Sequence, residues 1–184
     1  VNKGTQFTIK ISGGVAYLHF ILGYTTKEEF EENATSSAPY FDLEVWDDSV
    51  RFSGPKSYAE NYTYEQLTQC AELWQKISSV SNQVPSGSSD IGINFLFDCF
   101  VAAGAAVAFV GRNTVNCPLS WMTSCLDYNS FVKNGAWGNI HEYNHHYQRF
   151  GFAPGDEVTN NAVSLVSYSL FTDISSARTE AGGL

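Results

Sequence analysis

The sequence predicts an α+β fold in which a β-rich N-terminal part is followed by a largely helical part. Polar and apolar residues alternate in stretches of residues 1–24 and 40–52, which is the two-residue period of half-buried strands. Apolar residues then recur at helical spacing between residues 63 and 80. Two further helices are expected at residues 136–150 and from residue 156 through residue 168, so the predicted order is strands first and helices later.

The composition predicts a folded domain with a sizeable core. The chain has 184 residues, of which 43% are hydrophobic and 16% are charged, and these values exclude wholesale disorder. Lys and Arg together number 10 against 19 Asp and Glu, which gives a formal net charge of −9. A chain this acidic is repelled by phosphate backbones, so no nucleic-acid partner is expected.

No transmembrane segment is expected in this chain. Its longest apolar run covers residues 99–111 and is bounded by Asp98 and Arg112. That run is shorter than the roughly 18 to 20 residues that a membrane-spanning helix needs, so a buried strand or core helix is the better interpretation. The chain has neither an initiator Met nor a signal-peptide pattern, which is expected of a fragment of a longer precursor.

The N-terminal elements follow from the alternation and from the glycines that interrupt it. Residues 6–11 and 15–22 predict two strands joined by a tight turn at Ser12-Gly13-Gly14. The acidic stretch at residues 27–32 is expected to form a short solvated helix or loop.

A second pair of strands is expected before a domain boundary. Residues 40–52 predict two strands whose turn contains Asp47-Asp48-Ser49. Gly54-Pro55 then marks a break in the pattern. We therefore expect a β-rich segment at residues 1–55 and a separate functional domain at residues 56–184.

The second part begins with a helix and continues through less regular sequence. Thr63 is a plausible N-cap because Gln66 stands three residues later, which is the capping-box spacing. Residues 84–90 are expected to be a loop, and residues 91–110 are expected to form strand, turn and strand. Residues 117–134 are expected to be irregular and rich in turns.

The cysteines give two alternatives. The chain has four cysteines, and none of them form a C-x-x-C pair, so a Cys-ligated zinc site is not expected. A disulfide between Cys117 and Cys125 is one alternative if the protein is exported, and four unpaired buried thiols are the other. The sequons that begin at Asn33 and Asn61 permit N-glycosylation.

The strongest chemical signal lies in residues 141–146, which read HEYNHH. His141 and His145 are four residues apart, so on a helix they share one face and can bind a single zinc ion. Glu142 is displaced by about 100° around that helix, where a carboxylate can accept a proton from water. This is the H-E-x-x-H pattern of zinc peptidases. His146 is one residue out of phase and is expected to line a groove or support the site without binding the metal.

A third ligand is expected downstream, because catalytic zinc sites usually have three protein ligands and one open position. Glu157 is the best candidate, since the preceding Pro154-Gly155 turn allows a new helix to fold back on the first. Asp156 is more simply the N-cap of that helix. Asn160 or Asn161 could hold a ligand imidazole in the required tautomer. Two imidazoles and a carboxylate favour zinc over magnesium or calcium.

Residues 137–148 and 154–161 together resemble the enhancin-like, mucin-targeting zinc metallopeptidases of peptidase family M60, which are gluzincins. The resemblance implies that His141, His145 and Glu157 are the zinc ligands and that Glu142 is the general base. Gln148 and Asn161 match recurrent polar positions of the family. One position departs from the pattern, because Asn144 stands where the family usually has glycine before the second ligand histidine.

The resemblance also implies a fold and an activity. The fold would be a gluzincin-type core with an H-E-x-x-H helix and a downstream Glu-bearing helix, which makes residues 56–184 the catalytic domain. The activity would be zinc-dependent endopeptidase cleavage of protein or glycoprotein substrates, including mucin-like ones, at a secreted or cell-surface location. Tyr168 is a candidate for stabilising the oxyanion. Two alternatives remain: a catalytically inactive relative that acts as a binding or channel-associated module, and a glycan-binding β module in residues 1–55.

Overall fold

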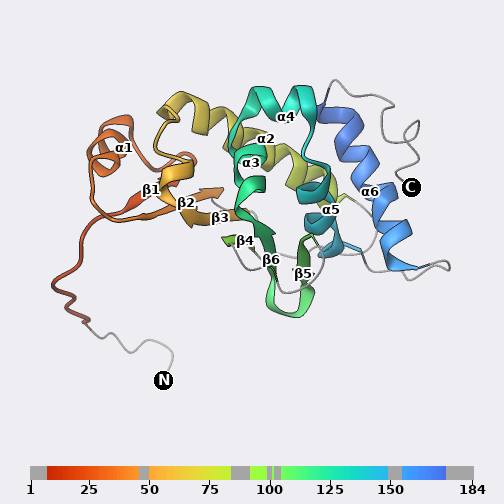
Figure 1. Cartoon of the computed structure of the whole chain (residues 1–184), viewed down its shortest axis with the longest axis horizontal. Helices are drawn as coiled ribbons and strands as arrows, with labels where there is room; N and C mark the ends of the chain where they lie inside the picture. Colours follow the sequence, from red (N-terminus) through yellow and green to blue (C-terminus); the bar gives the residue numbers. More distant parts are fainter. Residues whose placement is uncertain are drawn as a thin grey trace.

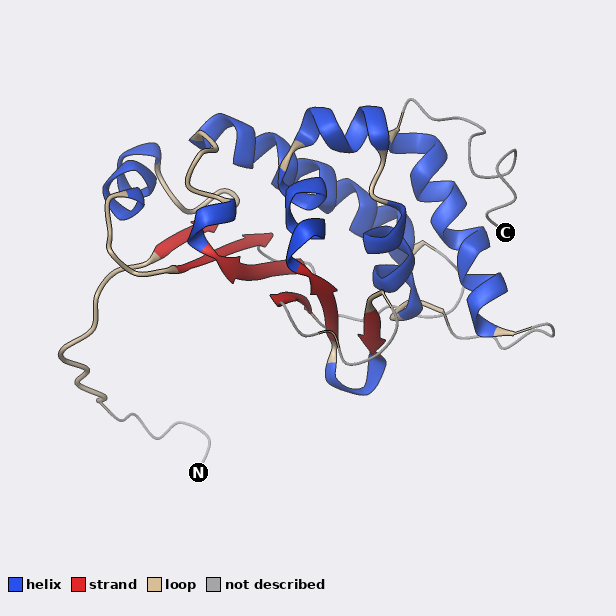
Figure 2. Ribbon diagram, in the orientation of Figure 1, coloured by secondary structure: helices blue, strands red, loops and turns tan. Residues whose placement is uncertain are grey.

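The computed structural model combines one mixed β-sheet with helices that pack on one of its faces (Figures 1 and 2). It describes residues 8–45, 50–83, 92–98, 101, 105–148 and 155–172. The strands are β1 Leu18–Ile21, β2 Tyr40–Val45, β3 Val50–Pro55, β4 Ile93–Asp98, β5 Val107–Phe109 and β6 Thr114–Pro118. The α-helices are α1 Lys27–Ala34, α2 Tyr64–Asn82, α3 Met122–Leu126, α4 Tyr128–Asn134, α5 Trp137–His145 and α6 Asp156–Phe171.

The sheet has the strand order β1-β2-β3-β4-β6-β5. Strands β2 and β3 pair antiparallel with Leu43 opposite Phe52, which confirms the paired strands predicted for residues 40–52. Their predicted turn at residues 47–49 lies outside the described residues. Strand β5 pairs antiparallel with β6 and lies at the end of the strand order, so it is an edge strand beside α5.

The prediction of two strands joined by a glycine turn near the N-terminus is wrong in its first half. Residues 8–11 form no strand, and the side chains of Ile9 and Ile11 are 69% and 85% exposed. An alternating sequence forms a stable strand only where one of its faces is buried, and the described residues 8–11 are exposed. The second strand is present as β1, which pairs parallel with β2.

Two helices begin with the capping box that stabilises a helix N-terminus. At α1 the pair is Thr26 and Glu29, which makes the acidic stretch a helix that buries Phe30 against the sheet edge. At α2 the Thr63 side chain accepts a hydrogen bond from the backbone N–H of Gln66, and the Gln66 side chain accepts one from the backbone N–H of Thr63. The start predicted for the second helix is therefore confirmed.

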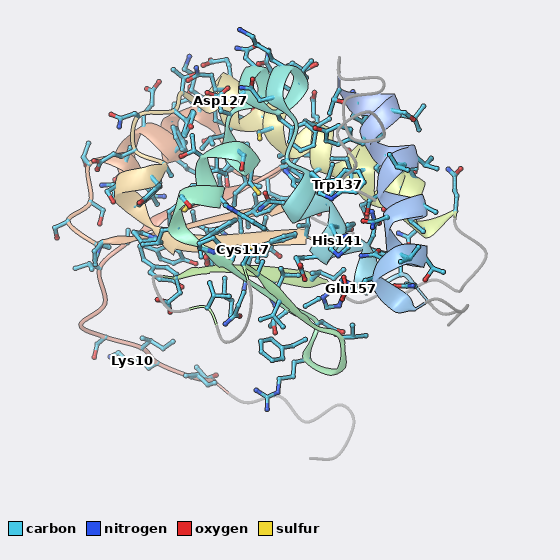
Figure 3. The ribbon with its side chains drawn as sticks, turned by 45° about the vertical axis from the view of Figure 1, so that its right-hand side comes forward. Lys10, Cys117, Asp127, Trp137, His141 and Glu157 are labelled. Carbon is cyan, nitrogen blue, oxygen red and sulfur yellow. The ribbon has the colours of Figure 1, made fainter. Side chains whose placement is uncertain are left out.

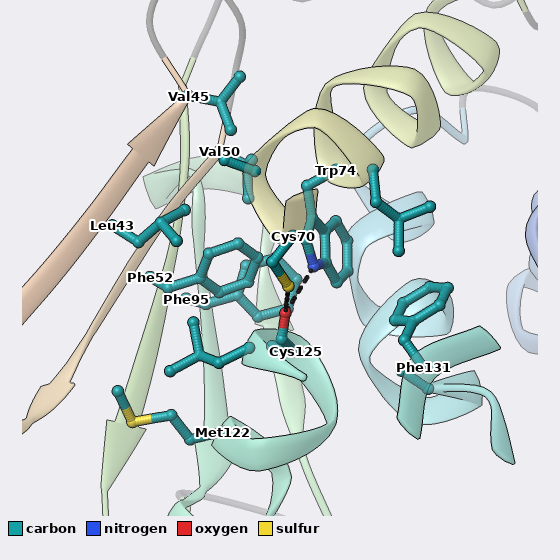
Figure 4. Close-up of a cluster of buried hydrophobic side chains, with 14 of the residues drawn as sticks. Leu43, Val45, Val50, Phe52, Cys70, Trp74, Phe95, Met122, Cys125 and Phe131 are labelled. Atoms are coloured by element: carbon teal, nitrogen blue, oxygen red, sulfur yellow. Dashed lines mark hydrogen bonds between the residues drawn. The ribbon is translucent and has the colours of Figure 1, made fainter. Parts of the chain in front are cut away.

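The core lies between the sheet and α2, around the buried indole of Trp74 (Figure 4). This ring lies 5.0 Å from the ring of Phe52 and 5.5 Å from the ring of Phe95, measured between centroids. Its Nε1–H donates a 3.2 Å hydrogen bond to the backbone carbonyl of Cys125, and the thiol of Cys70 donates to the same oxygen at 2.6 Å. These bonds satisfy buried polar groups while they connect α2 to α3.

The structure decides between the two cysteine alternatives for the described residues. Cys70, Cys117 and Cys125 are free and buried, so the predicted disulfide between Cys117 and Cys125 is wrong. Burial raises the pKa of all three thiols above its ordinary value. Cys99 lies outside the described residues.

Residues 117–134 are more regular than the sequence predicts. They include the end of β6 and the short helices α3 and α4. Helix α4 has Asp127 as its N-cap, whose Oδ1 accepts a 2.9 Å hydrogen bond from the backbone N–H of Ser130. Helices this short carry a weak periodic signal, because five to seven residues complete fewer than two turns.

The remaining predictions are confirmed in outline. Residues 91–110 do contain two strands, β4 and β5, although β6 lies between them in the sheet. Helix α5 ends at His145, earlier than the predicted end at residue 150. Helix α6 begins near the predicted position, but the N-cap is Gly155 and not Asp156, which is the first helical residue. The predicted loop at residues 84–90 lies outside the described residues.

The boundary expected at Gly54-Pro55 coincides with the end of β3. Strands from both sides of this boundary pair in the one sheet, and the division into two domains stays a prediction. Among the described helices, none has the length and apolar character needed to cross a membrane.

Candidate metal centre

Two neighbouring helices bring His141, His145 and Glu157 together (Figure 3). Both histidines lie on α5, and Glu157 lies in the first turn of α6. Nε2 of His141 is 2.9 Å from Oε2 of Glu157 and 3.1 Å from Nε2 of His145. Nε2 of His145 is 3.4 Å from the same carboxylate oxygen. Within the residues that the structure describes, no other group of three potential ligands has its atoms this close.

The four-residue spacing explains why the two imidazoles meet. On a helix, residues four apart are neighbours on one face, and the two rings lie 4.7 Å apart between centroids. Helix α6 is held against this face by Asn160, whose Nδ2 donates a 2.7 Å hydrogen bond to the backbone carbonyl of His141. Asn160 is fully buried, so this bond forms in a low-dielectric interface.

A second asparagine of α6 orients the first imidazole. Oδ1 of Asn161 lies 2.9 Å from Nδ1 of His141. A carbonyl oxygen only accepts hydrogen bonds, so Nδ1 carries the proton and the Nε2 of neutral His141 carries a lone pair. Asn161 therefore fixes the tautomer that metal binding requires, as predicted for Asn160 or Asn161.

The donor set fits a zinc ion. Two imidazole nitrogens and a carboxylate oxygen converge on one point, an arrangement that a shared proton or a shared metal cation stabilises. Tetrahedral zinc bonds of about 2.0 to 2.1 Å would separate the ligand atoms by about 3.3 Å. The three separations of 2.9, 3.1 and 3.4 Å surround that value. Imidazole and carboxylate ligands are also a common zinc combination.

Glu142 lies beside this cluster and not within it. Together with His145 and Glu157 it lines a cavity of about 250 Å³, whose opposite wall is formed by Ala106, Val107, Ala108 and Val110. Burial raises the pKa of Glu142 above its ordinary value, and the nearby imidazoles of His141 and His145 oppose that rise. A carboxyl group with a raised pKa, placed at the wall of a cavity, is suited to exchanging protons with a bound molecule.

Glu157 has the opposite shift. Partial burial tends to raise its pKa, but hydrogen bonds and charges from His141 and His145 outweigh that effect and hold the pKa below its ordinary value. Its side chain is 76% exposed, in contrast to the 14% exposure of each imidazole. The ligand cluster is therefore open to solvent on the side of α6.

Two other predicted residues lie next to the cluster without joining it. His146 is buried beside the backbone of Thr114, and burial lowers its pKa to about 4. The structure thus keeps His146 out of the ligand set. Nε2 of Gln148 donates a hydrogen bond to Oγ1 of Thr159, which ties the end of α5 to the first turns of α6.

Tyr168 is not brought to the cluster. Its hydroxyl donates a 3.4 Å hydrogen bond to the backbone carbonyl of Asn134, and its ring packs edge-on against Trp137. Tyr168 lies eleven residues after Glu157, which is about three helical turns along α6. It secures the far end of α6 against the start of α5.

Sequence reasoning did not assign structural roles to two groups of residues. The residues of β5 and its flanks that line the cavity carry no recognisable sequence motif, because they come to line the site only when the sheet has formed. Asn144 was visible as a departure from the family pattern, but its partners Ser81 and Ser164 lie more than 15 residues away in the sequence. Apolar spacing carries no information about such long-range polar contacts.

The chain is similar in sequence to two curated proteins. The chain is 30% identical to Antigenic protein NP1 from Entamoeba histolytica, over 91% of this chain and 30% of that protein. It spans only 11% and 30% of the lengths of two curated relatives that it matches.

Two solved structures from Clostridium perfringens have a similar fold. The ZmpB metallopeptidase has a TM-score of 0.61 and 18% identity, with 85% of this chain and 34% of that chain covered. The M60 catalytic domain of ZmpC, in complex with the sialyl T antigen, has a TM-score of 0.60 and 19% identity, with 85% and 33% covered. The TM-scores establish a shared fold, and the architecture expected for an M60 catalytic core is confirmed.

The sequence profile of one family extends over nearly the whole chain. It matches residues 13–182, which include the ligand cluster, Glu142 and all of the described strands. The chain belongs to the peptidase M60, enhancin and enhancin-like family.

Proposed function

We propose that this protein is a zinc-dependent endopeptidase in which His141, His145 and Glu157 hold the metal. The observation that carries the proposal is the convergence of three ligand atoms from α5 and α6 with the carboxyl group of Glu142 beside them. The family and the metallopeptidase neighbours support a peptidase function.

When bound, zinc would supply Lewis-acid polarisation of the scissile carbonyl and lower the pKa of water. The protein would supply the proton transfers. Glu142 would accept the proton of the attacking water and deliver it to the leaving amine. Burial raises the pKa of Glu142 above its ordinary value, which makes the carboxylate a stronger base toward water and supports this role.

The edge of the sheet supports a binding mode for the substrate backbone. Within the described residues, strand β5 pairs with β6 on one side and with no strand on the other. Val107 and Ala108 of this strand and the flanking Ala106 and Val110 line the cavity with Glu142. Edge strands present unpaired N–H and C=O groups, so an extended peptide could add to β5 and place its scissile bond beside Glu142. Asn144 does not obstruct this route, because its side chain is fully buried between helices.

We further propose glycoprotein or mucin-like substrates and a secreted or cell-surface location. The similar ZmpC domain was solved in complex with the sialyl T antigen, which supports a glycan-bearing substrate here. Asn61 lies in a sequon and its side chain is exposed, which is compatible with N-glycosylation in an exported protein.

The test compares cleavage of a mucin-type glycoprotein by the wild-type protein and by Glu142→Gln. This variant keeps all three proposed ligands, so it should bind zinc like the wild type and lose cleavage by at least a hundredfold. Zinc binding without cleavage by the wild-type protein would favour the alternative, an inactive relative that serves as a binding or channel-associated module. Cleavage that survives in Glu142→Gln would reject the assigned base.

A further inference from the structure

Asn144 is a fully buried amide that connects three helices directly behind the ligand cluster. Its Oδ1 accepts a 2.7 Å hydrogen bond from the hydroxyl of Ser81 on α2. Its Nδ2 donates a 3.3 Å hydrogen bond to the hydroxyl of Ser164 on α6. Both serines are almost fully buried, at 1% and 0% exposure. We refer to Ser81, Asn144 and Ser164 as the three-helix junction.

A polar junction is an unusual way to join helices in a core. Apolar side chains of similar volume would bury the same surface without the desolvation penalty of three polar groups. Hydrogen bonds add direction, because they weaken steeply when the donor–acceptor distance or angle departs from a narrow range. The junction therefore specifies how far each helix can slide along its neighbours.

The metal centre depends on that register. Two ligands lie on α5 and the third lies on α6, so sliding α6 by one residue would displace Glu157 by about 1.5 Å. Metal–ligand bonds tolerate deviations of only about 0.2 Å. Ser164 is seven residues after Glu157, nearly two full turns, and Asn144 immediately precedes His145. The bond between Asn144 and Ser164 thus joins the two ligand-bearing helices close to the ligands themselves.

Other contacts between α5 and α6 do not involve α2. Asn160 and Asn161 both contact His141, and Gln148 contacts Thr159. Asn144 hydrogen-bonds to α2 and α6 together. Helix α2 is anchored in the core by the fully buried Trp74, so the junction connects the helices that carry the proposed ligands to the packed core.

We propose that Asn144 is a positioning residue, which sets the register of α6 against α5 and so places Glu157 opposite the two ligand histidines. This inference rests on the metal site of the proposed function. A glycine at this position could form neither side-chain bond, so the proposed role requires the asparagine side chain.

The experiment measures three properties of Ser164→Ala and Asn144→Leu. They are the thermal unfolding of the metal-free protein, the zinc affinity in competition with a chelator, and the visible absorption spectrum of the cobalt-substituted protein. Ser53→Ala is the matched control, because Ser53 is another buried serine whose hydroxyl donates a hydrogen bond, to Asp42 at 2.5 Å in the sheet.

Ser164→Ala and Ser53→Ala should lower the unfolding temperature by similar amounts, and Asn144→Leu should lower it further because it removes two hydrogen bonds. Ser164→Ala and Asn144→Leu should in addition weaken zinc binding by about tenfold or more, as expected for residues that orient ligands. They should also change the cobalt spectrum, whereas Ser53→Ala should change neither the affinity nor the spectrum. The double variant Asn144→Leu with Ser164→Ala should bind zinc no more weakly than Asn144→Leu alone. Asn144→Leu already removes the bond between Asn144 and Ser164, so the second substitution has no further bond between them to break.

Wild-type zinc affinity and an unchanged cobalt spectrum in Ser164→Ala would overturn the proposal and leave the junction a purely structural feature. If Asn144→Leu does not fold, Ser164→Ala alone decides the question. A wild-type protein that binds zinc but cleaves no substrate would reject the proposed peptidase activity. The zinc affinities and cobalt spectra of the variants would still test the role of Asn144. A wild-type protein that binds no metal would overturn both proposals.

Discussion

Asn161 accepts a hydrogen bond from Nδ1 of His141 across the interface between α6 and α5, at 2.9 Å. The contact leaves the lone pair of Nε2 directed at the point where the other two ligand atoms converge. Helix α6 thus supplies one proposed metal ligand, Glu157, and, four residues later, Asn161, which orients the proposed ligand His141. The site therefore depends on the position of α6 relative to α5.

Replacement of Asn161 by Ala should weaken zinc binding by about 10- to 100-fold, because His141 loses the partner that fixes its tautomer. Competition with a fluorescent chelator measures this affinity. Asn134→Ala provides the control, since the Asn134 side chain is exposed on α4 and does not contact the cluster. Equal affinities in the two variants would show that Asn161 does not orient the ligand.

Zinc should stabilise the folded protein through the two helices that carry the ligands. A ligand present at a hundred times its dissociation constant adds about 2.7 kcal/mol to the free energy of unfolding. We expect this gain in the wild-type protein and its loss in His145→Ala, measured by chemical denaturation with zinc and with EDTA. An identical gain in His145→Ala would place the metal elsewhere.

The buried thiols should resist alkylation in the native protein. Burial raises the pKa of Cys70, Cys117 and Cys125, so the reactive thiolate is scarce and the reagent has no access. Mass spectrometry after iodoacetamide treatment should find these three unmodified in the native state and fully modified in denaturant. Rapid native labelling of any of them would contradict their burial, which Figure 4 shows for Cys70 and Cys125.

Gly135 should tolerate substitution poorly, for two separable reasons. Its φ angle of +72° is unfavourable for residues with a Cβ, and an added Cβ would also overlap the ring of Tyr168. Gly23 provides the matched control, because its φ angle is +81° and nothing lies within 4 Å of its added Cβ. Gly23→Ala should lower the free energy of unfolding by about 1 to 2 kcal/mol.

The comparison isolates the contact with Tyr168. Gly135→Ala should lose clearly more stability than Gly23→Ala in urea denaturation, since it also displaces the tyrosine that secures α6. Equal losses would mean that Tyr168 moves aside without penalty and that this end of α6 is loosely held.

Much of the fold followed from local patterns that the tertiary structure reinforces. The α2 helix and its Thr63 cap were predictable, because the capping box and the apolar face lie within one short stretch of sequence. The antiparallel pair β2 and β3 was predictable for the same reason, since its strands adjoin in the chain. The strand expected at residues 6–11 is absent from its described part, residues 8–11, because alternation alone does not provide a surface to bury it.

The candidate site was predictable to the extent that it resides in short motifs. The spacing of His141 and His145 defines a shared helical face, and Glu157 was identified as the carboxylate that opens the next helix. The contact of Tyr168 with Asn134 could not be read from spacing, because it depends on how α6 packs against the end of α4. The three-helix junction includes a hydrogen bond between residues 63 positions apart, Ser81 and Asn144.

The most direct test of the central claim is a crystal structure of the zinc-loaded protein with anomalous diffraction recorded on both sides of the zinc absorption edge. We predict one strong anomalous peak within bonding distance of Nε2 of His141, Nε2 of His145 and a carboxylate oxygen of Glu157. A zinc peak at any other position, with these three side chains directed away from one another, would contradict the account.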